Sequence, residues 1–89
     1  MTWTRQSLHS ELVKVFQLHA EDGVTVTDAS ELVADLGIDS LGVMELIADL
    51  EDKFTLTIPD DALREVDTVA DVARAIEAKL RADGKLEEG

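Results

Sequence analysis

Apolar residues recur near the start of the chain at the spacing of one helix face. Four of them are separated by three or four positions or adjoin one another: Leu8, Leu12, Val15 and Phe16. This spacing predicts an amphipathic helix over residues 4–19. Gly23, which follows two acidic residues, marks the turn after this segment.

A second apolar stripe begins shortly after residue 40. It consists of Val43, Leu46, Ile47, Leu50 and Phe54. The stripe predicts a helix from Ser40 to Phe54 whose apolar face lies in the core. Asp39 or Ser40 is expected to be its N-cap, because both residue types are favoured there.

A third stripe lies in the last quarter of the chain and consists of Val69, Val72, Ala73, Ile76 and Leu80. It predicts a helix that begins at Thr68, since Thr68 and Asp71 have the spacing of a capping box. Ahead of this helix, Pro59 can open a short helical turn over residues 60–65.

The segments between the stripes predict loops. The alternating residues 24–27 and 55–58 are too short to form a stable strand pair, so we expect them to place apolar side chains under the helices. The sequence therefore predicts an all-α fold, a small four-helix bundle of three long helices and one short one. We expect one domain over residues 1–82 and a frayed polar tail over residues 83–89.

Composition narrows the class of protein. A chain of 89 residues supports one core, and the absence of cysteine excludes disulfides and thiolate metal sites. No apolar run approaches the roughly 18 residues of a membrane span. The first residues do not form a signal peptide, so we expect a cytoplasmic protein. Met1 and the short flanks predict a free-standing protein, with a domain trimmed from a longer synthase as the alternative, and we expect a monomer.

The negative charge is concentrated in the middle of the chain. The net charge is -12, and residues 21–67 alone carry fourteen acidic groups against two basic ones. This field repels nucleic acid and anionic lipid surfaces and attracts partners with basic patches. The alternative is that the acidity serves only solubility, but solubility does not require the charge to surround Ser40.

Ser40 lies where a loop becomes a helix and admits several chemistries. A serine hydrolase would favour Gly-x-Ser-x-Gly after a strand, whereas Gly37 stands three residues before Ser40. The possible bases, His9 and His19, both belong to the first predicted segment. We therefore expect no catalytic triad and no enzyme activity.

Two further possibilities concern metal and phosphate. The acidic segment lacks the ligand order of a calcium-binding EF-hand loop, so we expect no dedicated metal site. Ser40 could serve as a helix cap, but Asp39 can take that role and leave the hydroxyl free. A phosphate on Ser40 would meet the unpaired N–H groups and positive dipole end of a helix start.

The chain resembles the acyl carrier proteins from its first helix to about Leu80. The resemblance is carried by Leu36-Gly37-Ile38-Asp39-Ser40-Leu41, Glu45-Leu46, Leu50-Glu51, Phe54, Ile58-Pro59 and Thr68-Val69-Ala70-Asp71. It implies a bundle of the acyl-carrier type with 4′-phosphopantetheine on Ser40, added from coenzyme A by a phosphopantetheinyl transferase. The arm would supply the thiol that a cysteine-free carrier lacks, and the protein itself would catalyse nothing.

The resemblance also implies a docking surface for an acyltransferase, a ketosynthase or a similar enzyme with a basic patch. The expected interface residues are Asp39, Leu41, Met44, Glu45, Ala48, Asp49, Glu51 and Asp52. An ordinary solvated helix face is the alternative explanation for these charges.

Two residues depart from the fatty-acid members of the family. Gly42 stands where an acidic or polar residue is frequent, and Met44 stands where a β-branched residue is common. These departures favour polyketide or other specialised acyl biosynthesis over a housekeeping fatty-acid role. A non-covalent acidic helical adaptor is the alternative outside the family.

Overall fold

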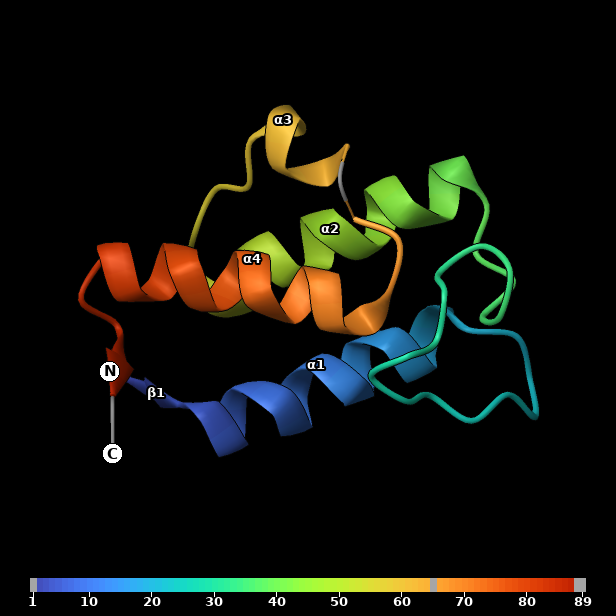
Figure 1. The fold of residues 1–89 in the computed structure, drawn as a ribbon, viewed down its shortest axis with the longest axis horizontal. Coiled ribbons are helices and arrows are strands. Elements are labelled where there is room, and N and C mark those ends of the chain that lie inside the picture. Colours follow the sequence, from blue (N-terminus) through green and yellow to red (C-terminus); the bar gives the residue numbers. More distant parts are fainter. Residues whose placement is uncertain (1, 65, 88–89) are drawn as a thin grey trace.

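Three long helices make up the body of the protein (Figure 1). The computed structural model describes residues 2–64 and 66–87, without the side chains of Asp60 and Leu63. The elements in chain order are β1 (Trp3–Thr4), α1 (Arg5–His19), α2 (Ser40–Phe54), α3 (Asp60–Leu63), α4 (Val69–Ala82) and β2 (Leu86–Glu87). Helix α1 runs antiparallel to α2, and α3 lies above α2 and α4 in Figure 1.

The fold is mainly helical, as predicted. Helices α1, α2 and α4 occupy the segments that the three apolar stripes mark. Helix α3 covers only four residues, and the predicted end of this turn at Glu65 lies outside the described residues. The segments 24–27 and 55–58 are loops, in agreement with the sequence prediction.

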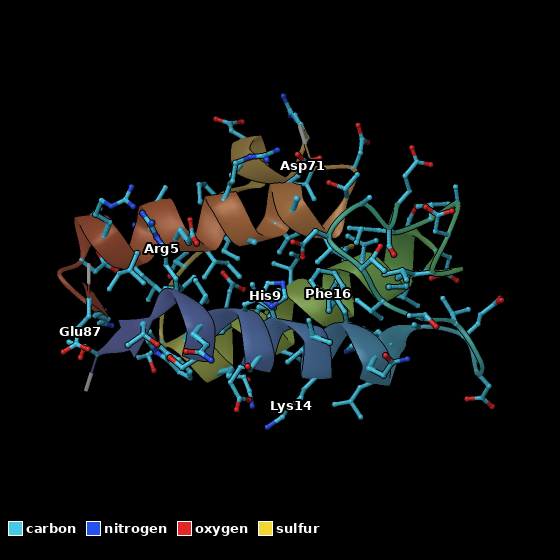
Figure 2. The ribbon with its side chains drawn as sticks, turned by 60° about the horizontal axis from the view of Figure 1, so that its bottom comes forward. Arg5, His9, Lys14, Phe16, Asp71 and Glu87 are labelled. Carbon is cyan, nitrogen blue, oxygen red and sulfur yellow. The ribbon has the colours of Figure 1, made fainter. Side chains whose placement is uncertain are left out.

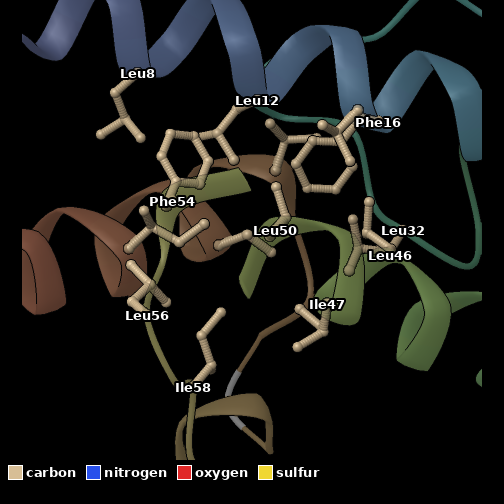
Figure 3. Packing of buried hydrophobic residues seen from close by; sticks show 14 of the residues in the cluster. Leu8, Leu12, Phe16, Leu32, Leu46, Ile47, Leu50, Phe54, Leu56 and Ile58 are labelled. Atoms are coloured by element: carbon tan, nitrogen blue, oxygen red, sulfur yellow. The ribbon is translucent and has the colours of Figure 1, made fainter. Parts of the chain in front are cut away.

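One hydrophobic core joins α1, α2 and α4 (Figure 3). Its eleven most deeply buried members are Leu8, Leu12, Phe16, Leu36, Leu46, Leu50, Phe54, Val69, Val72, Ile76 and Leu80. Each such side chain contributes roughly 1.5–3 kcal/mol on burial. The prediction that Val43 is a core residue is wrong, because it is half-buried and packs against the edge of the cluster.

The long loop between α1 and α2 is held by the start of α4. The first N–H groups of a helix have no partner within the helix and need acceptors elsewhere. Here the Val69 N–H donates to the Ser30 carbonyl at 3.0 Å, and the Ala70 N–H donates to the Asp28 carbonyl at 2.9 Å. The Leu32 N–H donates in return to the Asp67 carbonyl at 2.9 Å. The loop is therefore fixed to the body by its backbone.

Thr68 and Asp71 form the predicted capping box at the same junction. The Asp71 N–H donates to Thr68 Oγ1 at 3.2 Å, and Asp71 Oδ2 accepts from the backbone N–H groups of Asp67 and Thr68 at 3.0 and 3.1 Å. The backbone N–H of Asp67, with that of Thr68, lowers the pKa of the Asp71 carboxyl, since these donors favour its ionised form.

The two ends of the described chain meet in a small parallel strand pair that was not predicted. Trp3 pairs with Leu86, and the Trp3 N–H donates to the Lys85 carbonyl at 2.7 Å. The Trp3 ring packs edge-on against Phe54, with ring centroids 4.6 Å apart. Where the sequence predicted a frayed tail, the strand pair and the burial of Leu86 hold residues 83–87 against the body, and residues 88–89 lie outside the described chain.

Replacing Leu86 with alanine tests whether this tail stabilises the fold. Leu86→Ala should lower the free energy of unfolding by about 2 kcal/mol, at the low end for a buried leucine because the residue lies at the edge of the core. Urea denaturation measures the change. Glu87→Ala, at the exposed neighbouring position, is the matched control. Equal stability of the two variants would show that the tail contributes nothing.

A pH series tests the role of the Asp71 carboxylate. Its folded pKa is lowered, so its stabilising contribution is complete above the ordinary value of about 3.9 and is lost as pH falls through the folded pKa. The free-energy difference between the wild type and Asp71→Asn should therefore shrink below about pH 4. Urea denaturation at pH 7 and at pH 3 measures it, and a constant difference would contradict the assignment.

Candidate functional site

Ser40 is the first residue of α2 and is exposed to solvent. Its hydroxyl makes no hydrogen bond to any residue that the structure describes. The serine therefore stands at the junction of loop and helix, with a hydroxyl that has no hydrogen-bond partner among the described residues.

Asp39 is the N-cap of α2, which decides between the two predicted candidates. Its Oδ1 accepts a hydrogen bond from the Gly42 N–H at 2.7 Å, and its carbonyl accepts from the Val43 N–H at 2.8 Å. The N–H groups of Ser40 and Leu41 have no acceptor within residues 2–64 and 66–87. These two donors, at the positive end of the helix dipole, are available to an anion on the serine.

The backbone before Ser40 is held on both sides of Gly37. Leu36 and Ile38 are buried, and the Ile38 N–H donates to the Leu32 carbonyl at 3.0 Å. Gly37 has a φ of +70°, in the left-handed region where a side chain is strained. Two buried anchors and this turn fix the direction from which the chain enters α2.

The packing around Gly42 gives this glycine a local explanation. A Cβ at this position would lie 2.8 Å from Ile38 Cγ2 and 3.1 Å from Asp39 Oδ1. Ile38 is buried and Asp39 is the cap, so neither can move without cost. Glycine therefore allows the cap to close over the first turn, and its presence carries less information about the pathway than the sequence interpretation assumed.

Both histidines are hydrogen-bonded to carboxylates of other elements. His9 Nε2 lies 2.7 Å from Asp28 Oδ1 in the loop, and His19 Nε2 lies 2.6 Å from Asp49 Oδ2 on α2. No hydrogen bond joins either ring to Ser40 in the described chain.

The described residues contain no group of three or more acidic or histidine side chains placed to hold a metal ion. None of the helices in this part of the chain is both long enough and apolar enough to cross a membrane.

The predicted docking residues divide into two groups. Five of them are exposed on the outer face of α2, without a hydrogen bond or ion pair to any other described side chain: Leu41, Met44, Glu45, Ala48 and Asp52. We call these five residues the outer face of α2. Leu41 and Met44 are 64% and 68% exposed and lie one turn apart, so this face carries a small apolar patch.

The other three predicted docking residues make internal contacts. Asp39 caps the helix, and Asp49 is bonded to His19. Glu51 is half-buried, and its Oε2 accepts a hydrogen bond from the Ile58 N–H at 2.8 Å, which holds the segment after α2. These acids serve the fold as well as the surface potential.

Sequence reasoning missed two residues of α1 that border this surface. His19 was interpreted through its place at the helix end, whereas its ring reaches Asp49 on α2. Leu18 lies outside the apolar stripe of α1 and is 81% exposed. Its spacing of six residues from Leu12 and two from Phe16, which places it off the stripe, was the signal that could have identified it.

Comparison with known sequences gives a consistent result over most of the chain. Residues 6–76 match the family model described as a phosphopantetheine attachment site. An acyl carrier protein from Exiguobacterium sp. is 51% identical over 59 residues, which cover 60% of this chain and 75% of the relative. An acyl carrier protein from Helicobacter pylori is 50% identical over 56 residues, covering 63% and 72%.

Solved structures show the same similarity in three dimensions. The actinorhodin acyl carrier protein from Streptomyces coelicolor, in its 5-phenyl-3-oxo-pentyl form, is 30% identical and superimposes with a TM-score of 0.66. The match covers 84% of this chain and 92% of that one. A candidate acyl carrier protein from Mycobacterium tuberculosis is 27% identical, with a TM-score of 0.64 over 83% and 95% of the two chains.

Replacing Gly42 with alanine tests the packing argument. If the glycine were simply a poor helix former, Gly42→Ala would stabilise the protein by up to about 1 kcal/mol. We expect a loss of about 0.5–2 kcal/mol instead, because the added methyl group displaces the Asp39 cap. Ala48→Gly, at an exposed position of the same helix, gives the propensity effect alone. Urea denaturation of the two variants decides between the explanations.

Proposed function

Since the chain belongs to the acyl carrier protein family, we propose that Ser40 is the residue that carries its 4′-phosphopantetheine. The proteins of this family hold the arm covalently on a serine and are carriers, not enzymes. They interact with a phosphopantetheinyl transferase and with enzymes that handle acyl groups. When attached, the arm supplies the thiol on which an acyl group is held as a thioester.

This proposal rests mainly on the exposed hydroxyl of Ser40, which has no hydrogen-bond partner among the described residues. Because Asp39 takes the capping role, Ser40 Oγ remains exposed and without a partner among the described residues. The unpaired N–H groups of Ser40 and Leu41 suit the negative charge of a phosphodiester on this oxygen. These features fit an attachment point better than a structural serine.

The residues around Ser40 position the attachment point without taking part in chemistry. The buried Leu36 and Ile38 fix the loop, and Asp39 fixes the helix start. A tethered acyl group then meets a docked enzyme at a high effective concentration, although the docking itself can be weak. Weak, fast docking suits a carrier that must leave one partner for the next.

The outer face of α2 is the proposed docking surface for these partners. It combines the apolar side chains Leu41 and Met44 with the carboxylates of Glu45 and Asp52. Such a surface favours a basic partner, because electrostatic attraction increases the association rate more than the affinity. We also propose that the carrier domain extends beyond residues 1–82 to residues 83–87, which pack against the body.

We place the carrier in polyketide or other specialised acyl biosynthesis. The similarity to the actinorhodin carrier over most of both chains supports this pathway class, and Met44 is consistent with it. The bacterial relatives of about 50% identity support the carrier role and leave a housekeeping fatty-acid role as the alternative.

Loading from coenzyme A tests the attachment site. The purified protein, incubated with coenzyme A, magnesium and a broad-specificity phosphopantetheinyl transferase, should gain the mass of one phosphopantetheine. Ser40→Ala should abolish the gain, whereas Ser10→Ala, an exposed serine of α1, should load like the wild type. Intact-protein mass spectrometry provides the measurement.

Two other results would contradict the assignment. An unchanged mass of the wild type, under conditions that load a control carrier, would favour the acidic adaptor. Loading of Ser40→Ala would place the arm on another residue.

A further inference from the structure

Leu18 is the most exposed of the four large apolar side chains on the described surface. It is 81% exposed, compared with 68% for Met44 and 64% for Leu41. Three residues earlier on the same helix, Val15 is only 5% exposed. An isolated exposed leucine is ordinary, so the surroundings of Leu18 decide whether its exposure indicates a binding surface.

Leu18 borders an open groove of about 620 Å³ between α1 and α2. Val15 and the partly buried Trp3 add apolar surface to the groove, and Asp49 and Asp52 line it from α2. Figure 2 shows the neighbouring Lys14 extending away from the body on the side of α1 that faces away from α4. The groove thus combines apolar side chains from one helix with carboxylates from the other.

An ion pair and a hydrogen bond connect the two walls of this groove. Lys53 Nζ lies 2.8 Å from Glu11 Oε2, and His19 Nε2 lies 2.6 Å from Asp49 Oδ2. The hydrogen bond from the Lys53 ammonium lowers the pKa of the Glu11 carboxyl, since it favours the ionised form. These contacts join α1 to α2 across the groove.

The same contacts determine which charged side chains of the groove lack a partner. Lys53 is engaged by Glu11, so the groove presents no cation that is free of an ion pair among the described residues. Asp52 has no ion-pair or hydrogen-bond partner for its carboxylate in this part of the chain. The groove therefore offers an apolar side chain beside an unneutralised negative charge.

We propose that this groove binds a basic segment of a partner enzyme. The segment places an apolar side chain against Leu18 and Val15 and a lysine or arginine against Asp52. Asp52 also belongs to the outer face of α2, so one partner reaches both surfaces. A second copy of this chain is disfavoured by its net charge of -12, and the same charge disfavours anionic lipid.

This inference depends on the proposed function for the kind of partner, an enzyme that handles the acyl arm. It does not depend on modification of Ser40, because the groove lies on α1 and the C-terminal half of α2. Binding can therefore be measured on the unmodified protein. A failure of binding and a failure of loading from coenzyme A are separate results.

A synthetic helical peptide is a direct probe of the groove. It carries leucines along one face, flanked by lysines one turn away, and a matched peptide replaces the leucines with glutamine. Titration into the isotope-labelled protein at low salt should shift the backbone amide signals of Val15, Leu18 and Asp52 more than those of Met44. The glutamine peptide should bind at least about fivefold more weakly, because it lacks the apolar contact.

Matched variants locate the binding surface. Leu18→Gln should weaken binding of the leucine peptide at least about fivefold, whereas Met44→Gln should change it less than about twofold. Asp52→Asn should reduce the salt dependence of binding, since it removes one attractive charge. All three positions are exposed, so circular dichroism should show an unchanged fold.

Three results would overturn the inference. They are no binding of the leucine peptide, equal binding of the two peptides, and a larger loss from Met44→Gln than from Leu18→Gln.

Discussion

The site depends on the first N–H groups of α4, which have no acceptor within their own helix. They need acceptors, and the carbonyls of Asp28 and Ser30 supply them from the long loop between α1 and α2. The capping box of Thr68 and Asp71 strengthens the same junction. These bonds fix the loop at its middle. Its last residues, anchored by Leu36 and Ile38, deliver Ser40 to the start of α2.

At the start of α2 one residue, Asp39, caps the helix, and its neighbour Ser40 is left for the proposed attachment. Asp39 satisfies the Gly42 N–H and leaves the adjoining serine without a structural role in the described chain. Gly42 makes this possible, because a side chain there would collide with Ile38 and with the capping carboxylate. The local cost in helix propensity is about 1 kcal/mol. The core and the caps offset that cost, and the exposed hydroxyl remains available for the arm of the family.

The acidic residues contribute to both the fold and the surface. Asp39, Asp71 and Glu51 accept hydrogen bonds from backbone N–H groups. Asp49 joins α2 to α1 through His19. The remaining carboxylates of α2 face solvent beside exposed leucine and methionine side chains, so charge can attract a partner and apolar contact can retain it briefly. A net charge of -12 is compatible with folding because many of these groups have specific partners.

The sequence alone determined the helices, because apolar residues at helical spacing need a buried face and Thr68 and Asp39 are favoured caps. The motif around Ser40 also identified the family, since it depends on neighbouring residues. Contacts between distant residues were decided by the tertiary structure. The pairing of Trp3 with Leu86, the bond of His19 to Asp49, and the exposure of Leu18 each depend on how the helices pack. Local patterns carry no information about which distant groups meet, because packing of the whole core sets those distances.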